Sequence, residues 1–135
     1  AKGNSNSQLQ TFEGCPSTAK IAQQNFKQLE IKNTDIIVGD FKNTLAKNIN
    51  TDIDLAFVDG NHNKKSTIEY FEIILKKSNN KTILVFDDIH WSSEMEQAWK
   101  HIKESKKTTV TIDLFFVGIV FLDKKLSKED YIIRF

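Results

Sequence analysis

Acidic residues follow two apolar runs of this sequence, and they are the first candidates for chemistry. Asp59 follows the run at 55–58, and Asp87 and Asp88 follow the run at 83–86. Such runs, rich in β-branched and aromatic residues, are typical of parallel strands buried on both faces, whose carboxyl ends meet at one edge of a sheet. Three carboxylates at one edge repel one another unless a cation or a hydrogen-bond-donating ligand lies between them. The spacing therefore predicts a ligand site at this edge.

Other polar residues lie where they could contribute to such a site. Glu13 and Asp40 each end an earlier apolar run, and His62 comes three residues after Asp59. Each has a simpler alternative, because strand-end acids often cap the next helix and a histidine in an Asn-rich loop is often a surface residue. One of the two adjacent aspartates, Asp88, could likewise cap the helix that starts near residue 92. These alternatives stay open at the level of the sequence.

The elements that must position these residues alternate along the chain. Apolar runs predict strands at residues 9–12, 34–38, 53–58, 81–86, 108–116 and 118–122. Helical spacing predicts helices that begin at Pro16, at Phe41, and at capping boxes that start with Ser66 and Ser93. The last two strands must be antiparallel, because a parallel connection needs about a dozen residues or more. A short apolar piece at 131–135 ends the chain. The pattern predicts an α/β fold with a doubly wound, mostly parallel sheet and a terminal antiparallel strand pair.

Composition bounds the class of protein. A chain of 135 residues with 39% hydrophobic and 27% charged residues is ordinary globular material, and we expect a single domain over residues 1–135. The net charge of +1 argues against nucleic acid as a partner. No run reaches the ~18 apolar residues of a membrane span, and there is no signal-peptide core. One cysteine, Cys15, excludes an internal disulfide and fits a reducing compartment, so we expect a cytoplasmic protein with no membrane partner.

The order of elements and the strand-end acids together resemble the class I S-adenosylmethionine-dependent methyltransferases. That family has a Rossmann-like sheet whose last strand inserts antiparallel to the rest. The resemblance implies that Glu13 accepts hydrogen bonds from the ribose hydroxyls and that Asp40 takes the adenine amino group, with Phe41 packed on the ring. The resemblance also implies that Asp59 lies beside the methionine part of the cofactor and that Cys15 is a small neighbour of the cofactor's adenine. The cofactor-binding residues that it implies are Glu13, Gly14, Cys15, Asp40, Phe41 and Asp59.

A narrower resemblance is to metal-dependent, catechol-type O-methyltransferases that act on small molecules. In those enzymes an aspartate after one strand and an acidic pair after the next hold magnesium, which implies Asp59, Asp87 and Asp88 as metal ligands here. Hard oxygen ligands suit magnesium, which can lower the pKa of a bound hydroxyl. The family's catalytic lysine, three residues after the first aspartate, is replaced by His62, which implies a histidine base. The resemblance implies a small-molecule methyl acceptor.

The sequence departs from that family at one point, because no glycine-rich loop after a first strand is present. We therefore expect the carboxy-terminal part of a longer protein, with on the order of 50 residues upstream, and an isolated fragment that is inactive. The strand that carries the missing loop would lie between residues 9–12 and 53–58. Without it, we expect residues 1–33 to be loosely attached or a strand to be borrowed from another copy in a homodimer.

Two other classes of function remain open from the sequence. A magnesium-dependent phosphoryl-transfer or phosphohydrolase domain also gathers aspartates at a sheet edge, although its usual Asp-x-Asp motif is absent. A noncatalytic α/β interaction module would bind no small molecule. Trp91 is the better candidate for a pocket wall, whereas His90 and Trp99 are expected to pack in the interior.

Overall fold

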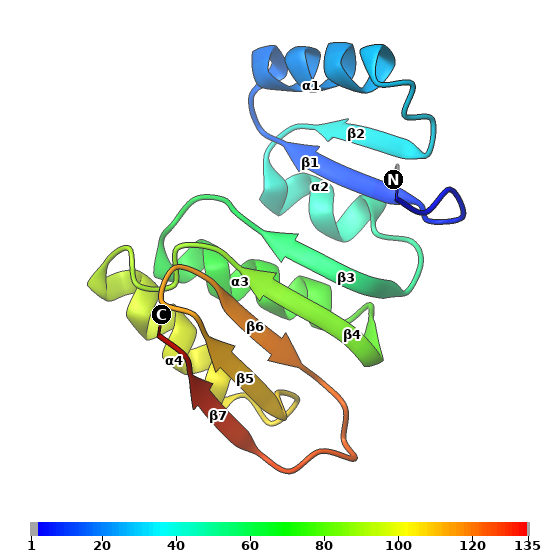
Figure 1. Ribbon diagram of the computed structural model, residues 1–135. Coiled ribbons are helices and arrows are strands. Elements are labelled where there is room, and N and C mark those ends of the chain that lie inside the picture. The colour runs from blue at the N-terminus through cyan, green and yellow to red at the C-terminus, as the bar shows by residue number, and fades with distance from the viewer. Residues whose placement is uncertain (1–2, 135) are drawn as a thin grey trace. The chain divides into compact units, whose positions relative to one another are not determined.

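The structure is a computed structural model that describes residues 3–134. The sequence predicts one domain, and the chain divides into two compact units, residues 1–49 and 50–135. The strands of the two parts form two separate sheets, one with two strands and one with five (Figure 1). The α/β class, the parallel pairings and the terminal antiparallel pair are confirmed.

The first unit contains two β-α repeats. Its elements are β1 (Leu9–Glu13), α1 (Pro16–Gln28), β2 (Thr34–Val38) and α2 (Phe41–Asn48). The two strands are parallel, with Leu9 opposite Thr34 and Glu13 opposite Val38, so their carboxyl ends meet at one edge. Pro16 begins α1 because its fixed φ suits the first helical position. Leu45 of α2 and Ala19 of α1 are buried.

The second unit is a mixed five-stranded sheet with helices on one face. Its elements are β3 (Ile53–Val58), α3 (Lys64–Leu75), β4 (Ser78–Phe86), α4 (Ser93–Glu104), β5 (Val110–Asp113), β6 (Gly118–Phe121) and β7 (Glu129–Ile132). The strand order is β3-β4-β6-β5-β7. β3 is parallel to β4, and β6 lies antiparallel between β4 and β5. The short connection between β5 and β6 allows no other pairing.

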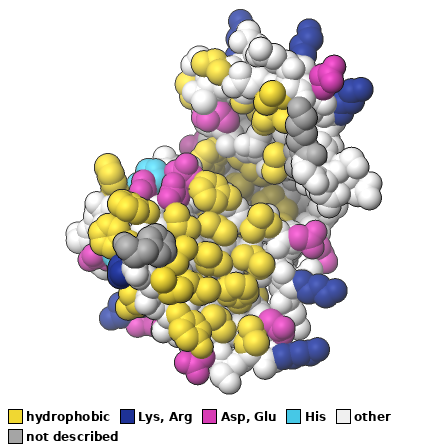
Figure 2. All heavy atoms as spheres, viewed as in Figure 1, with side chains coloured by type: hydrophobic (Ala, Val, Ile, Leu, Met, Phe, Trp, Pro, Cys, Tyr) yellow, Lys and Arg dark blue, Asp and Glu magenta, His cyan; other side chains and the backbone are white. Residues whose placement is uncertain are grey.

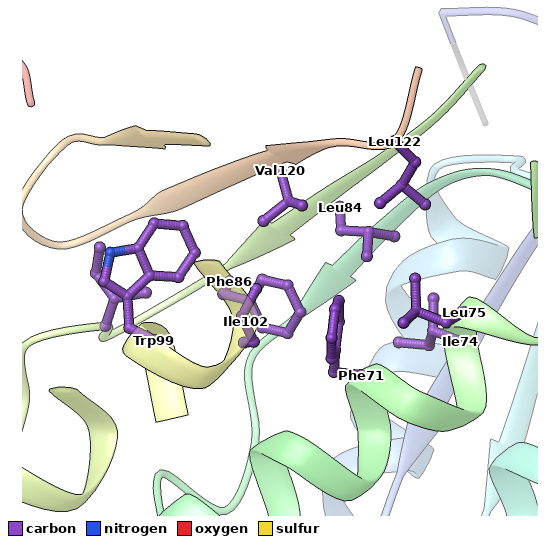
Figure 3. Close-up of a cluster of buried hydrophobic side chains, with 10 residues drawn as sticks. Phe71, Ile74, Leu75, Leu84, Phe86, Trp99, Ile102, Val120 and Leu122 are labelled. Carbon is purple, nitrogen blue, oxygen red and sulfur yellow. The ribbon is translucent and has the colours of Figure 1, made fainter. Parts of the chain in front are cut away.

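The core of the second unit lies between this sheet and the helices α3 and α4 (Figure 3). Alternate residues of β4 and β6, among them Leu84, Phe86 and Val120, face the helices and are buried. They meet Phe71 of α3 and Trp99 of α4, which are also buried. The expected core position of Trp99 is thus confirmed.

Several boundaries differ from the sequence prediction. Asn63 rather than Ser66 caps α3, because its Oδ1 accepts a hydrogen bond from the Ser66 amide at 3.0 Å. In the same way Ser92 rather than Ser93 caps α4 and accepts from the Met95 amide at 3.2 Å. β4 begins at Ser78, earlier than expected. The apolar piece near the carboxyl end forms β7, which pairs in parallel with β5; Phe135 lies outside the described residues.

The expected gap in strand pairing is present among the described strands. β1 pairs only with β2, and the one partner of β3 is β4, so no ladder joins residues 9–13 to residues 53–58. The first unit ends at residue 49, and β2 is bonded to β1 along its whole length. The loose attachment of residues 1–33, or a strand borrowed from another copy, stays a prediction.

Candidate functional site

The ends of β3 and β4 bring two of the predicted acidic segments together. The parallel ladder continues one step beyond the strands, since the Asp87 amide donates to the Val58 carbonyl at 3.0 Å. Asp59 and the pair Asp87 and Asp88 therefore leave the sheet at neighbouring positions. Asp59 is exposed, and the two later aspartates are half-buried. This adjacency is what the sequence predicts for parallel strands.

His62 lies between two of these carboxylates. Its Nε2 is 3.4 Å from Asp59 Oδ1, and its Nδ1 is 3.4 Å from Asp88 Oδ2. The loop that carries it is held at both sides, because Asn61 donates through Nδ2 to the Tyr70 hydroxyl at 2.7 Å and Asn63 caps α3. His62 is one-third exposed rather than fully on the surface. The ring is thus oriented by two acids and remains open to solvent, as a proton-transferring group requires.

The expected metal ligands lie near one another but are not arranged as a complete metal centre. Within residues 3–134, no three His, Cys, Asp or Glu side chains are grouped so that they could hold a metal ion. The His62 ring lies between the carboxylates of Asp59 and Asp88, and the backbone of Asp88 is in the left-handed region with φ 55°. The assignment of Asp59, Asp87 and Asp88 as metal ligands stays a prediction.

An aromatic pocket adjoins Asp88. It measures about 130 Å³ and is lined by Asp88, His90, Trp91, Phe115 and Phe116. Trp91 lines this pocket, which agrees with its expected place in a pocket wall, and its side chain is 71% exposed. Phe115 has a φ of 75°, which is unusual for a bulky residue and costs free energy. The pocket wall is therefore held in a strained backbone conformation.

A network of contacts centred on the buried Asp113 supports this wall and was missed by the sequence analysis. His90, expected to play a packing role, lies with Nε2 2.8 Å from Oδ2 of the buried Asp113. Oδ1 of Asp113 accepts hydrogen bonds from the Phe115 amide at 2.9 Å and from Arg134 at 3.0 Å. Burial acts to raise the pKa of Asp113, but the hydrogen bonds from His90, Phe115 and Arg134 outweigh it and hold that pKa below its usual value. Nothing in the sequence pattern indicates a functional role for Asp113, because it lies within a predicted strand and outside the acidic segments that follow β3 and β4.

In the first unit, the predicted residues lie at the carboxyl ends of β1 and β2. Oε1 of Glu13 accepts from the Cys15 amide at 2.8 Å, and Asp40 caps α2 by accepting from the Lys42 amide at 2.8 Å. The capping role foreseen as the alternative for Asp40 is thus present, and Glu13 binds its own loop. Each carboxylate still has a second oxygen that can accept a hydrogen bond from a ligand.

Cys15 is exposed beside these two acids. Its Sγ lies 2.9 Å from Ser17 Oγ, and this hydrogen bond, with further ones to Thr18, lowers the pKa of Cys15 to about 7. Gly14 precedes it and has no atom within 4 Å of where a side chain would start, so the backbone here is open to a ligand. The structure thus leaves room at Gly14 and Cys15 for a bound group.

A hollow of the first unit lies elsewhere. It measures about 580 Å³ and is lined by Phe26, Glu30 and Asp35 among others, at the amino end of β2. Ligands of α/β sheets bind beyond the carboxyl ends of the strands. We therefore assign the site to the Glu13 and Asp40 edge and not to this hollow.

The chain belongs to a family of methyltransferase domains. A family model described as "Methyltransferase domain" matches residues 1–89, which is more than half of the chain and includes every predicted cofactor-binding residue. A search of curated proteins found no match. Among the described residues, no helix is long and apolar enough to cross a membrane.

Solved methyltransferase structures share the fold. SAH-bound PaMTH1 of Podospora anserina is 18% identical, with a TM-score of 0.74 over 87% of this chain and 62% of its own. The O-methyltransferase of Bacillus cereus in complex with SAH is 18% identical, with a TM-score of 0.70 over 85% of this chain and 63% of its own. TomG of Streptomyces achromogenes, an O-methyltransferase in complex with SAM, is 18% identical, with a TM-score of 0.69 over 87% of this chain and 63% of its own. The chain spans less than two thirds of each.

Proposed function

We propose that the protein containing residues 1–135 transfers the methyl group of S-adenosylmethionine to an oxygen atom of a small molecule. The observation that carries the proposal is the family match over residues 1–89, because that range contains the acidic residues that end or follow strands β1 to β4. The structural neighbours add support, since O-methyltransferases among them were crystallised with SAM or SAH.

In this proposal the first unit binds the adenosine half of the cofactor. Glu13 accepts from the ribose hydroxyls and Asp40 from the adenine amino group, each through the oxygen that its own loop does not use. Phe41 packs on the adenine ring, while Gly14 and Cys15 offer an unobstructed backbone beside it. These residues fit the cofactor because their side chains are acceptors and the cofactor's hydroxyl and amino groups are donors.

Within the second unit, we assign Asp59 to cofactor binding and His62 as the base. Asp59 is an exposed acceptor that suits the amino group of the methionine part. When bound, the cofactor supplies an electrophilic methyl group on a positively charged sulfur. His62 takes the proton of the acceptor hydroxyl on one ring nitrogen, while the carboxylate beside the other nitrogen stabilises the imidazolium. With the cofactor held by these residues, the methyl group would pass to the deprotonated acceptor oxygen, and the sulfur would keep the electron pair of the broken carbon–sulfur bond.

The pocket at Trp91 lies next to this base. Asp88 belongs both to the pocket and to the pair of acids that flank His62, and the rings of His62 and Trp91 are 6.5 Å apart. We assign the methyl acceptor to this side of the site, where the aromatic walls exclude water from one face of the acceptor.

The proposal is tested by transfer of a labelled methyl group from S-adenosylmethionine to a panel of small hydroxylated acceptors. The assay uses the complete product of the reading frame that encodes residues 1–135, with magnesium and with a chelator. His62→Ala should lower kcat by about 10²- to 10⁴-fold, the range for loss of a general base, with cofactor affinity unchanged. The matched control is His101→Ala, because His101 is also an exposed histidine beside a carboxylate, with its Nε2 3.9 Å from Oε1 of Glu72. Equal loss in both variants, or none in His62→Ala, would overturn the role of His62.

A further inference from the structure

The aromatic pocket beside Asp88 is built from two separate segments of the second unit. Asp88, His90 and Trp91 lie in the loop that follows β4, and Phe115 and Phe116 lie in the turn between β5 and β6. The register of the sheet brings these segments together, because the ends of β4 and β5 both pair with the beginning of β6. Figure 2 shows histidine and acidic side chains together at the margin of the hydrophobic surface of this unit. The pocket therefore exists only while the loop and the turn keep their relative positions.

Asp113 bonds to both of these segments, although it is not one of the residues that line the pocket. It is the last residue of β5 and is buried. Its Oδ2 lies 2.8 Å from Nε2 of His90 in the loop, and its Oδ1 accepts a hydrogen bond from the Phe115 amide in the turn at 2.9 Å. The His90 ring also stacks on the Phe115 ring, with the centroids 5.6 Å apart. One carboxylate thus holds one residue of each wall.

The two walls need such support because each contains a residue with an unusual backbone conformation. Asp88 has a φ of 55°, and Phe115 has a φ of 75°. The left-handed region is costly for a bulky residue and persists only where the surrounding structure holds it. The amide that Asp113 binds is that of Phe115, so the carboxylate acts directly on the strained residue. Without this hydrogen bond the turn would relax, and the Phe115 ring would leave the wall.

Arg134 completes the arrangement from outside the pocket. Its Nη1 donates to Oδ1 of Asp113 at 3.0 Å and to the Asp113 carbonyl at 2.9 Å, and its guanidinium carbon lies 5.5 Å from the centroid of the Phe115 ring. This ion pair offsets the cost of burying a carboxylate, but a buried ion pair seldom adds more stability than apolar side chains of similar volume. The acid therefore contributes a defined geometry, because its two oxygens bind different segments.

We infer that Asp113 is a positioning residue of this pocket, which holds His90 and Phe115 so that the loop and the turn form one preformed surface for the bound molecule. The inference rests on the proposed function only for the identity of that molecule as the methyl acceptor. A preformed wall favours binding because its side chains do not have to be ordered when the molecule arrives. All of these residues belong to the second unit.

Binding of phenol, a small aromatic probe with a hydroxyl group, tests this inference without methyl transfer. The complete product of the reading frame is labelled with 5-fluorotryptophan, and the fluorine resonance that is lost in Trp91→Phe reports on the pocket wall. Titration of phenol into the parent protein and into Asp113→Asn gives the Kd at this site. The matched control is Asp123→Asn, because Oδ1 of Asp123 also accepts from the amide two residues later, that of Lys125, at 3.0 Å. Asp123 follows the far end of β6, away from the pocket.

The inference predicts that Asp113→Asn raises the Kd of phenol on the order of 10-fold, because the side chains of His90 and Phe115 would then have to be ordered on binding. Asp123→Asn should bind phenol like the parent. In a Phe115→Gly background the change at Asp113 should add little, because the ring that Asp113 positions is gone and glycine adopts a positive φ without strain. An effect of Asp113→Asn that is equally large in both backgrounds would overturn the inference, since it would reflect a general loss of structure.

Arg134→Gln is the second variant, for the case that Asp113→Asn does not fold. The Arg134 side chain is 46% exposed and does not line the pocket, so its loss should leave the fold intact and raise the Kd of phenol by a smaller factor. Unchanged affinity in Asp113→Asn, or in Arg134→Gln where only that variant folds, would contradict the positioning role. Absence of phenol binding to the parent would contradict it as well. Failure of the proposed function would instead appear as absent methyl transfer with the phenol titrations as predicted.

Discussion

The imidazole of His90 and the carboxylate of Asp113 are joined by a 2.8 Å contact between Nε2 and Oδ2. His90 follows β4 and Asp113 ends β5, and the same carboxylate also binds Arg134, which follows β7. Arg134 lies over the Phe115 ring, 5.5 Å from its centroid, and the His90 ring stacks on Phe115 at 5.6 Å. One buried acid thus connects three segments and fixes the aromatic wall of the pocket.

Replacing this acid should destabilise the protein in a pH-dependent way. Asp113→Asn should lower the free energy of unfolding by about 2 to 3 kcal/mol at pH 7, the range for hydrogen bonds to a charged group. The pKa of Asp113 is below its unfolded value, so its stabilising contribution is full above about pH 4 and is lost as the pH falls through the folded pKa. Denaturant unfolding at a series of pH values measures the difference.

The control for this prediction is Asp52→Asn, since Asp52 is exposed just before β3. A difference between wild type and Asp113→Asn that stays constant down to pH 3 would show that the effect is one of packing and not of charge.

A second prediction concerns the contact between Gly118 and Trp99. A Cβ at position 118 would lie 2.6 Å from Cη2 of the buried indole, which cannot move without disturbing the core. Gly118→Ala should therefore destabilise the protein by about 1 to 3 kcal/mol. Gly14→Ala, where nothing lies within 4 Å, should have a far smaller effect. The double variant Gly118→Ala with Trp99→Phe should lose less stability than the sum of the losses in the two single variants. Strictly additive losses would contradict the steric clash between position 118 and Trp99.

A third prediction concerns the reactivity of Cys15. Because its pKa is about 7, its alkylation rate by iodoacetamide should rise with pH through a midpoint near 7. Ser17→Ala removes the hydrogen bond that lowers the pKa of Cys15 most. The midpoint should therefore move upward, toward the ordinary thiol value of about 8.5. Ser93→Ala, in the second unit, serves as the control. A parent midpoint already near the ordinary value would contradict the hydrogen bond from Ser17.

The sequence predicted what depends on chain order and local pattern. Asp59 could be placed near Asp87 because parallel strands joined by a helix align their carboxyl ends, and the short link at Val117 dictated the antiparallel pair. Asp113 could not be predicted as part of a network, because its contact with His90 depends on the register of β5 in the folded sheet.

The arrangement of the acidic side chains around His62 could not be predicted either. Spacing along the chain places residues at a sheet edge, but it does not set the direction of each side chain. Asp88 adopts a left-handed backbone conformation, and the ring of His62 occupies the space between its carboxylate and that of Asp59. The helix cap formed by Asn63 was missed for a related reason, since Ser66 carries the more familiar capping-box signature.

Binding of S-adenosylhomocysteine to the complete product of the reading frame, measured by calorimetry, tests the central claim most directly. The account predicts binding to the parent protein and a Kd raised about 10- to 150-fold by Glu13→Gln, equivalent to ~1.5 to 3 kcal/mol for a charged hydrogen bond left unmade. Glu129→Gln, at an exposed acid on β7, should bind like the parent. Absence of binding to the parent, or equal affinity of the parent and Glu13→Gln, would contradict the account.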